Sequence, residues 1–223
     1  MVQVHFKNAA TVYDVGTIYC IGRNYAEHAR ELNNPVPQSP IIFLKPAASL
    51  IFDGQSVVIP AASGDVHHEV EMVALIGKIG KRISLDMALG HVAGYGIGID
   101  VTARDIQQRA KDKSHPWAVA KGYDTFAPVS KFIPADGVAD PAATDVALWV
   151  NGERRQYGNT RDMLFPIRNL VAYLSTIFTL MPGDLIFTGT PAGVGALRAG
   201  DRLRAVLGDD LVALNVDVKQ EPA

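Results

Sequence analysis

Short apolar runs separated by turn-forming residues dominate this chain. Gly, Pro, Asp and Asn punctuate runs that are rich in Val and Ile, which is the pattern of short strands bounded by turns. Asn151-Gly152, between the apolar segment 148–150 and the polar segment 153–155, predicts a tight hairpin. We expect strands at 12–21, 41–44, 56–59, 69–79, 92–100, 147–150, 184–188, 202–206 and 211–218.

Helical patterns are fewer. The spacing of apolar residues predicts helices at 25–32, 85–89, 103–111 and 167–179, and Thr102-Ala-Arg-Asp105 resembles a capping box at the start of the third. Many strands with scattered helices, and no regular strand–helix alternation, predict a β-rich α+β fold. The 223 residues show no tandem repeat or linker-like tract, so we expect a single domain over 1–223.

Composition narrows the class of protein. Hydrophobic residues make up 48 % of the chain and charged residues 20 %, which excludes general disorder. A formal net charge of −2 without a dense basic cluster argues against nucleic-acid and membrane-surface partners. The single cysteine, Cys20, fits a reducing compartment. With no signal pattern at the N-terminus and no apolar helix long enough to span a bilayer, we expect a soluble cytoplasmic protein.

Three acidic residues carry the strongest chemical signal. Glu69 and Glu71 are two apart, so in a strand they project to the same side, among the apolar residues of 70–76. Asp100 ends the apolar run 92–99. Like charges in such a place repel each other and are costly to desolvate. A hard divalent cation removes that difficulty, and three carboxylates suit Mg²⁺ or Mn²⁺.

The alternative is that these acids lie at solvated strand edges or turns, as most acidic residues do. Two glutamates at strand spacing, taken alone, would favour the solvated surface over a metal site. Asp100 changes the balance, because it closes a run that is too apolar for an exposed strand. The sequence therefore favours a metal site.

Other polar residues stand where they could serve such a site. His28 and Glu31 are three apart and share a helix face, so the carboxylate could orient the imidazole to activate water; taken alone, an exposed surface pair is the commoner explanation. The predicted helix after Asp100 carries Arg104, Gln107, Gln108 and Arg109, whose donors could grip a carboxylate, although any solvated helix shows similar spacing.

Two further segments are ambiguous. Lys121 lies among small and aromatic residues, but lysines are usually exposed. The glycine-rich segment 188–195 lacks the Gly-Lys-Ser/Thr ending of a phosphate-binding loop, yet its backbone and Thr190 could cradle a small anion. The glycines of 94–98 do not match a dinucleotide fingerprint, so we reject nucleotide binding.

Six segments in order resemble the fumarylacetoacetate hydrolase family, in particular its short acylpyruvase-like members, the acylpyruvate and fumarylpyruvate hydrolases. The resemblance runs from about residue 18 to 218. It rests on Gly22-Arg-Asn-Tyr25 with His28 and Glu31, Phe43-Leu-Lys-Pro46, His67-His-Glu-Val-Glu71, Asp100-Val-Thr-Ala-Arg-Asp105, Lys121-Gly-Tyr-Asp124 and Gly189-Thr-Pro-Ala-Gly-Val-Gly195.

The resemblance implies a mixed β-sandwich roll with peripheral helices, assembled as a homodimer. It implies Mg²⁺ or Mn²⁺ on Glu69, Glu71 and Asp100. By the same matching, the catalytic residues are a water-activating dyad and a substrate-polarising lysine: His28, Glu31 and Lys121. The positions implied to contact substrate are Arg23, Lys45, Arg104, Gln107 and Thr190.

The reaction we expect is hydrolysis of a C–C bond in a 2,4-diketo acid, such as fumarylpyruvate or acetylpyruvate, to pyruvate and a carboxylic acid, as in aromatic compound catabolism. Water activated by His28 would attack the 4-keto carbon and expel a pyruvate enolate. The Pro-rich segment 32–38 could close over the substrate as a lid.

Two other functions stay open. Decarboxylation or tautomerisation of oxaloacetate, or isomerisation of a dienoate, uses the same enolate without an activated water, so the His28/Glu31 dyad favours hydrolysis. A catalytically silent keto-acid or metal-binding protein predicts damage to the dyad or the carboxylates, and the sequence shows none.

Overall fold

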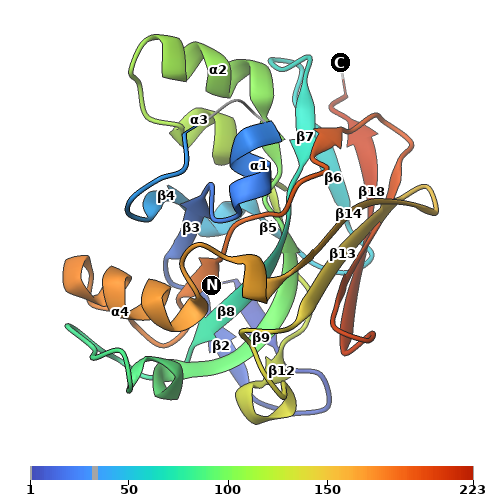
Figure 1. Cartoon of the computed structure of the whole chain (residues 1–223). Helices are drawn as coiled ribbons and strands as arrows, with labels where there is room; N and C mark the ends of the chain where they lie inside the picture. The colour runs from blue at the N-terminus through green and yellow to red at the C-terminus, as the bar shows by residue number, and fades with distance from the viewer. Residues whose placement is uncertain (1, 32–34, 223) are drawn as a thin grey trace.

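Two mixed β-sheets packed face to face form the body of the protein (Figure 1). The computed structural model describes residues 2–31 and 35–222. The six-stranded sheet has the order β12 (Ile133–Pro134), β9 (Val92–Ile99), β8 (Val70–Ile76), β15 (Leu185–Phe187), β3 (Ile18–Gly22) and β4 (Ile41–Lys45). The five-stranded sheet has the order β14 (Glu153–Asn159), β13 (Asp145–Val150), β17 (Arg202–Leu207), β18 (Val212–Gln220) and β6 (Ser56–Ile59). The predicted β-rich sandwich is confirmed.

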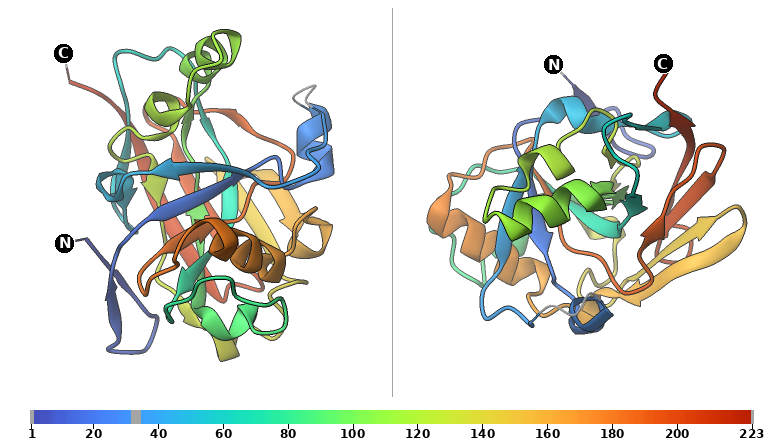
Figure 2. Two further views of the ribbon diagram at one scale, coloured as in Figure 1. Left: turned by 90° about the vertical axis from the view of Figure 1, so that its left-hand side faces the viewer. Right: turned by 90° about the horizontal axis from the view of Figure 1, so that it is seen from above.

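Smaller elements surround the two sheets. The helices are α1 (Ala26–Glu31), α2 (Arg104–Asp112), α3 (Ala118–Lys121) and α4 (Ile167–Ile177). The short strands are β1 (Gln3–His5), β2 (Val12–Asp14), β5 (Leu50–Ile51), β7 (Val66–His68), β10 (Thr102–Ala103), β11 (Ala127–Pro128) and β16 (Gly195–Ala196). Helices α2 and α3 lie together at one end of the sandwich (Figure 2). In the described part of the chain, no helix is long and apolar enough to cross a membrane.

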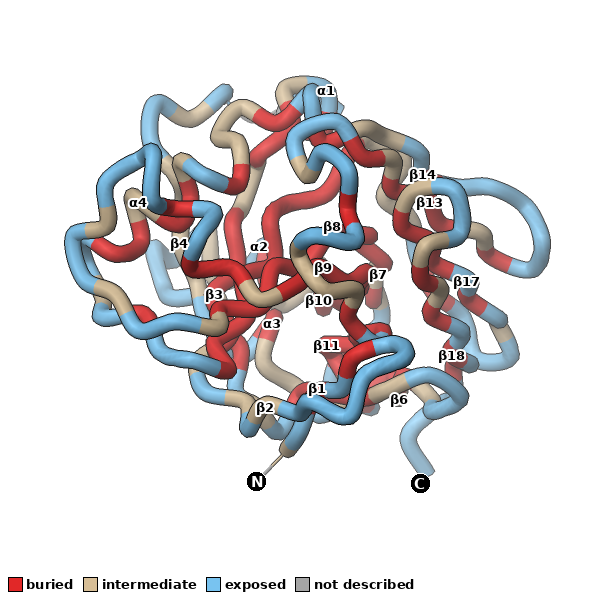
Figure 3. Tube along the Cα trace, turned by 90° about the horizontal axis from the view of Figure 1, so that it is seen from below, coloured by how far each residue is buried: buried red, intermediate tan, exposed pale blue. Residues whose placement is uncertain are grey.

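Strands β8 and β9 of the six-stranded sheet are buried on both faces (Figure 3). Alternate residues of β8 enter different apolar clusters, as the period of two requires. Met72 and Ala74 belong to the cluster between the two sheets, whereas Val73 and Leu75 pack with the N-terminal segment. Burial on both faces explains why this strand reads as a continuous apolar run.

The sequence located most strands but misplaced several boundaries. The predicted strand 12–21 is two strands, β2 and β3, because the Thr17 backbone N–H donates to Asp184 Oδ1 at 2.7 Å instead of a neighbouring strand. The predicted strand 69–79 begins at Val70 and ends at Ile76. The hairpin at Asn151-Gly152 is confirmed, with φ of 54° and 84° at these residues.

Two helix predictions need correction. The segment 85–89 is a turn followed by a 3₁₀ turn at Ala88–His91, because backbone N–H groups such as that of Gly90 donate to the carbonyl three residues earlier, here Met87 at 3.1 Å. The expected capping box is wrong: helix α2 begins at Arg104 and its N-cap is Ala103, which makes no side-chain capping hydrogen bond. The hydroxyl of Thr102, two residues before the helix, donates to the Asp100 carbonyl at 3.1 Å. The other two predicted helices are α1 and α4; residue 32 of the prediction lies outside the described residues.

The glycines at alternate positions of β9 lie where a neighbouring strand leaves no room for a side chain. A Cβ at Gly98 would stand 2.6 Å from Phe187 Cε1 and 2.8 Å from Val73 Cγ2. Neighbouring strands therefore approach so closely that only hydrogen fits at this position.

We expect Gly98→Ala to lower the free energy of unfolding by about 1–3 kcal/mol, because the added methyl overpacks the core. Urea denaturation monitored by circular dichroism measures the change. Gly64→Ala is the matched control: no atom lies within 4 Å of its Cβ position, and a change under about 0.5 kcal/mol is expected. Equal stability of the two variants would contradict this account of β9.

Candidate active site

The strand register brings three carboxylates together inside the protein. Glu71 lies on β8 opposite Gly98 of β9, and the Asp100 backbone N–H donates to the Glu69 carbonyl at 2.8 Å. One ligand atom from each of Glu69, Glu71 and Asp100 lies within 4.8 Å of the others, and all three residues are at most 5 % exposed. Glu69 and Glu71 thus form one cluster with Asp100, which is distant in the sequence; we call it the carboxylate cluster.

Three cations surround the carboxylate cluster. Lys121 Nζ lies 3.0 Å from Glu69 Oε2 and 2.6 Å from Asp100 Oδ2. The Arg104 guanidinium pairs with Glu69 Oε1. Lys45 Nζ lies 2.8 Å from Asp100 Oδ1, but this oxygen accepts no hydrogen bond in the described residues. Without further ions, three negative charges are therefore matched by three positive ones.

The three carboxylates differ in how well their charge is compensated. Burial raises the pKa of Glu71 well above its usual range, and the nearby Asp100 and Glu69 raise it further. The Gly189 N–H donates to Glu71 Oε2 at 2.7 Å. Burial would also raise the pKa of Glu69, but Lys121 and Arg104 hold it well below its usual range. Glu71 is thus the member that most lacks a cation.

A hard divalent ion fits this donor set. Such an ion prefers carboxylate oxygens as ligands. Within the described residues, Asp100 Oδ1 is buried and accepts no hydrogen bond, and no cation pairs with Glu71. Binding would also remove the repulsion that raises the pKa of Glu71.

His28 and Glu31 stand together on α1. His28 is 4 % exposed, and its Nδ1 lies 3.4 Å from Glu31 Oε2. The Gly193 backbone N–H donates to both oxygens of Glu31, at 3.1 and 3.2 Å. Burial lowers the pKa of His28, although Glu69 and Glu31 act in the opposite direction. The imidazole is therefore neutral near pH 7 and available as a base. The proposed lid at 32–38 includes residues 32–34, which lie outside the described residues.

Helix α2 directs its first turn toward the carboxylate cluster. Arg104 Nη1 donates to Gln107 Oε1 at 2.8 Å, and Gln107 is buried. Gln108 is instead exposed and donates to Asp112 at 2.7 Å. Of the two neighbouring glutamines, Gln107 is thus the one beside Arg104 and the site.

The other predicted substrate contacts differ in their surroundings. Thr190 is buried next to Gly189, whose N–H holds Glu71. Arg23 is partly buried, which lowers its pKa, and takes a left-handed backbone conformation with φ of 58°. In the residues that the structure describes, Arg23 makes no ion pair.

The Lys45 ammonium bonds to the protein backbone and does not face an open pocket in the described structure. Its buried ammonium donates to the backbone carbonyls of Val101 at 3.0 Å, Phe126 at 2.9 Å and Lys121. A lysine has three N–H donors, so all of them are used. Lys45 thereby holds the segment after Asp100 against the end of α3, and the expectation that it lines the substrate region gains no contact here.

Comparison with known proteins places the chain. Residues 17–219 match the family described as Fumarylacetoacetate (FAA) hydrolase C-terminal. The chain belongs to the fumarylacetoacetate hydrolase family. It is 42 % identical to a mitochondrial oxaloacetate tautomerase of Arabidopsis thaliana over 223 residues, which cover 100 % of this chain and 97 % of the relative. It is 48 % identical to a mitochondrial oxaloacetate decarboxylase of Dictyostelium discoideum over 190 residues, or 84 % of this chain and 86 % of the relative.

Among solved structures, the chain is similar to a fumarylpyruvate hydrolase from Pseudomonas aeruginosa in complex with Mn²⁺ and pyruvate. The TM-score is 0.92 with 39 % sequence identity, and the match covers 99 % of this chain and 96 % of the other. The named relatives of this family member are thus enzymes, and one of them holds a divalent metal.

Sequence reasoning missed two residues near the site of this family member. Lys111 Nζ lies 5.7 Å from the centre of the Trp117 ring, and its pKa is lowered by burial and by the charges of Arg23 and Arg104, so it is a cation near the site. Its spacing from Arg104 and Gln107 on α2, at i+7 and i+4, could have indicated this. Gln156, on the opposite sheet, contacts Thr190 and carries no signal in the sequence.

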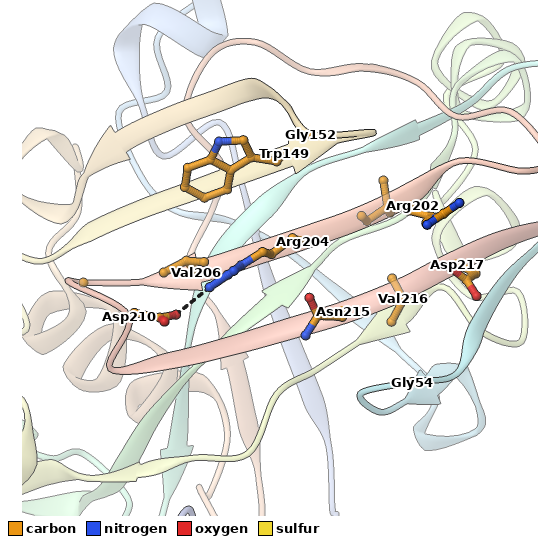
Figure 4. Close-up of a pocket in the computed structure, with 12 residues that line it drawn as sticks. Gly54, Trp149, Gly152, Arg202, Arg204, Val206, Asp210, Asn215, Val216 and Asp217 are labelled. Carbon is orange, nitrogen blue, oxygen red and sulfur yellow. Dashed lines mark hydrogen bonds and ion pairs between the residues drawn. The ribbon is translucent and has the colours of Figure 1, made fainter.

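A separate hollow on the surface lies away from the predicted site residues. An open depression of about 850 Å³ lies on the outer face of the five-stranded sheet (Figure 4). Trp149, Arg204 and Val216 line it, and Arg204 pairs with Asp210 at 2.9 Å. None of the predicted site residues lines it.

We expect Lys45→Met to lower the free energy of unfolding of the metal-free protein by about 3–5 kcal/mol, because it leaves three buried carbonyls and Asp100 without their cation. Chemical denaturation with urea measures this. Lys113→Met removes an exposed lysine and should change the value by less than about 0.5 kcal/mol. If the two variants were equally stable, Lys45 would not organise the site.

Proposed function

We propose that this family member is a divalent-metal-dependent enzyme that interconverts the keto and enol forms of oxaloacetate. The observation that carries the proposal is the carboxylate cluster, balanced by three cations and placed near the neutral imidazole of His28. Such a site can bind a keto acid, remove a proton next to its keto group and hold the charge that develops.

Charge supports a dicarboxylate substrate. Because Lys45, Lys121 and Arg104 already match the three carboxylates, a bound divalent ion would leave the site with an excess of about two positive charges. Lys111 and Arg23 add to that excess. Oxaloacetate and fumarylpyruvate carry two carboxylates each, whereas acetylpyruvate carries one. The names of the curated relatives point the same way.

Each residue has a defined task in this proposal. A divalent ion on Glu69, Glu71 and Asp100, either Mg²⁺ or Mn²⁺, would supply a Lewis acid for the oxygens of the keto acid. Arg104, Gln107 and Thr190 bind the carboxylate next to the keto group, with Arg23 at the edge of the site.

The proton moves through His28. Its neutral imidazole, oriented by Glu31, takes a proton from the carbon between the keto group and the distal carboxylate. The electron pair shifts to the 2-keto oxygen, where the Lys121 ammonium stabilises the charge. A proton delivered to this oxygen gives the enol, and one returned to the carbon restores the keto form.

Hydrolysis of an acylpyruvate is the second candidate function. The His28/Glu31 pair favours it, because a carboxylate-oriented imidazole is the arrangement that activates water. Similarity to the fumarylpyruvate hydrolase also supports it. The sequence alone favoured this reaction; we now prefer tautomerisation because curated relatives are named for oxaloacetate.

Homodimer assembly, a cytoplasmic location and a place in aromatic compound catabolism stay predictions. The carboxylates and the dyad stand together in the described residues, which argues against a silent binding protein.

We expect Mn²⁺ at about a hundredfold excess over its Kd to raise the Tm by about 5–10 °C, because it binds the folded state alone. Asp100→Asn should lose most of this shift, and the control Asp209→Asn, at an exposed position, should retain it.

The shift should be larger in mildly alkaline than in mildly acidic buffer, because the raised pKa of Glu71 means that a proton competes with the metal at low pH. Differential scanning fluorimetry measures all three. A full shift in Asp100→Asn would refute the ligand assignment.

Purified enzyme with Mg²⁺ should accelerate oxaloacetate enolisation well above the rate with Mg²⁺ alone, followed by the absorbance of the enol. His28→Ala should lower kcat by about 10²–10⁴-fold, since it removes the general base. His115→Ala, at an exposed histidine, should leave the rate unchanged. Parallel assays on fumarylpyruvate and acetylpyruvate separate the candidates: cleavage that depends on His28, with no enolisation above background, would establish hydrolysis instead.

A further inference from the structure

Gln156 connects the two sheets behind the site. It projects from β14 and is 1 % exposed. Its Oε1 lies 2.9 Å from His68 Nδ1 and accepts from the Val70 N–H at 3.0 Å. Its Nε2 donates to Thr190 Oγ1 at 2.9 Å and to the Pro191 carbonyl at 3.0 Å. All the hydrogen-bonding capacity of this buried amide is therefore used.

The direction of these hydrogen bonds is determined by two backbone groups. The Val70 N–H can only donate and the Pro191 carbonyl can only accept, so Oε1 of Gln156 must face Val70 and Nε2 must face Pro191. Because Oε1 is the acceptor, His68 Nδ1 must carry its hydrogen. Thr190 Oγ1 must then accept from Nε2.

This assignment leaves the Thr190 hydroxyl hydrogen free. Within residues 2–31 and 35–222, no second hydrogen bond involves Oγ1 of Thr190. The residue is 2 % exposed and follows Gly189, whose N–H donates to Glu71 of the carboxylate cluster. A buried hydroxyl beside the cluster thus has one unused donor.

We propose that Gln156 is a positioning residue that makes the Thr190 hydroxyl a hydrogen-bond donor to the substrate. The hydroxyl would then donate to an acceptor oxygen of the keto acid, which in the proposed site is an oxygen of its carboxylate. This inference rests on the proposed keto-acid function. Gln156 itself touches no substrate and acts through Thr190.

A double-mutant cycle tests the coupling. Thr190→Val should raise the KM for oxaloacetate by about tenfold or more, because a hydrogen bond to a charged group is lost. Gln156→Met should raise KM several-fold in the wild-type background with a smaller change in kcat. In the Thr190→Val background, it should change KM less than about twofold, because no hydroxyl remains to be oriented.

Controls separate positioning from support of the fold. Gln156→Glu keeps the acceptor for Val70 but turns the donor facing Thr190 into an acceptor, so its effect on KM should also shrink in the Thr190→Val background. If Gln156→Met does not fold, Gln156→Glu takes its place in the double-mutant cycle. Thr190→Ser, which keeps the hydroxyl, should restore most of the affinity, and Arg155→Gln, on the exposed side of β14, should change nothing.

Calorimetric binding of oxalate to the Mn²⁺-loaded protein gives a readout that needs no turnover. Oxalate offers carboxylate acceptors only, so the same coupling between the two positions should appear in its Kd. If oxaloacetate is not turned over but oxalate binding shows the coupling, the proposed function fails and the positioning role stands. Equal effects of the Gln156 variants in both backgrounds, or absence of oxalate binding, would overturn the inference.

Discussion

Burial of three carboxylates within 4.8 Å of one another is the constraint on which the rest of the site depends. Water is excluded from them, so their repulsion must be compensated by the protein and by bound ions. Lys121 and Arg104 compensate Glu69, and Lys45 and Lys121 compensate Asp100. Burial, and the neighbouring Asp100 and Glu69, raise the pKa of Glu71, whose one hydrogen bond within the described residues comes from the Gly189 N–H, so a divalent ion fits there.

The sandwich supplies rigid positions for this arrangement. Strands β8 and β9 are buried on both faces, so their register cannot slip without exposing apolar side chains to water or burying polar ones. That register places Asp100 beside Glu69. Lys45 then ties the segments after Asp100 and around α3 together through three carbonyls. A buried cation with every donor satisfied therefore acts as part of the scaffold.

One charged centre can support several reactions of keto acids, because each of them passes through an enolate. The reactions differ in which hydrogen-bond donors, acceptors and bases surround the carboxylate cluster. In the proposed reactions the buried His28, whose pKa is lowered by burial, would act as a base either for carbon or for water. With a divalent ion bound, the excess of positive charge would favour a dianion over a monoanion. The proposed orientation of the Thr190 hydroxyl would then determine which oxygen of the substrate it binds.

Local patterns were enough to predict a β-rich α+β fold, the hairpin at Asn151-Gly152 and the grouping of Glu69, Glu71 and Asp100, because short apolar runs, a turn dipeptide and acids beside apolar runs encode them. The sandwich arrangement was predicted from the family resemblance. Contacts between distant segments were decided only by the tertiary structure. Lys45 is occupied by carbonyls, and Gln156 reaches Thr190 from the opposite sheet, since both depend on how the two sheets pack and no local spacing records that packing.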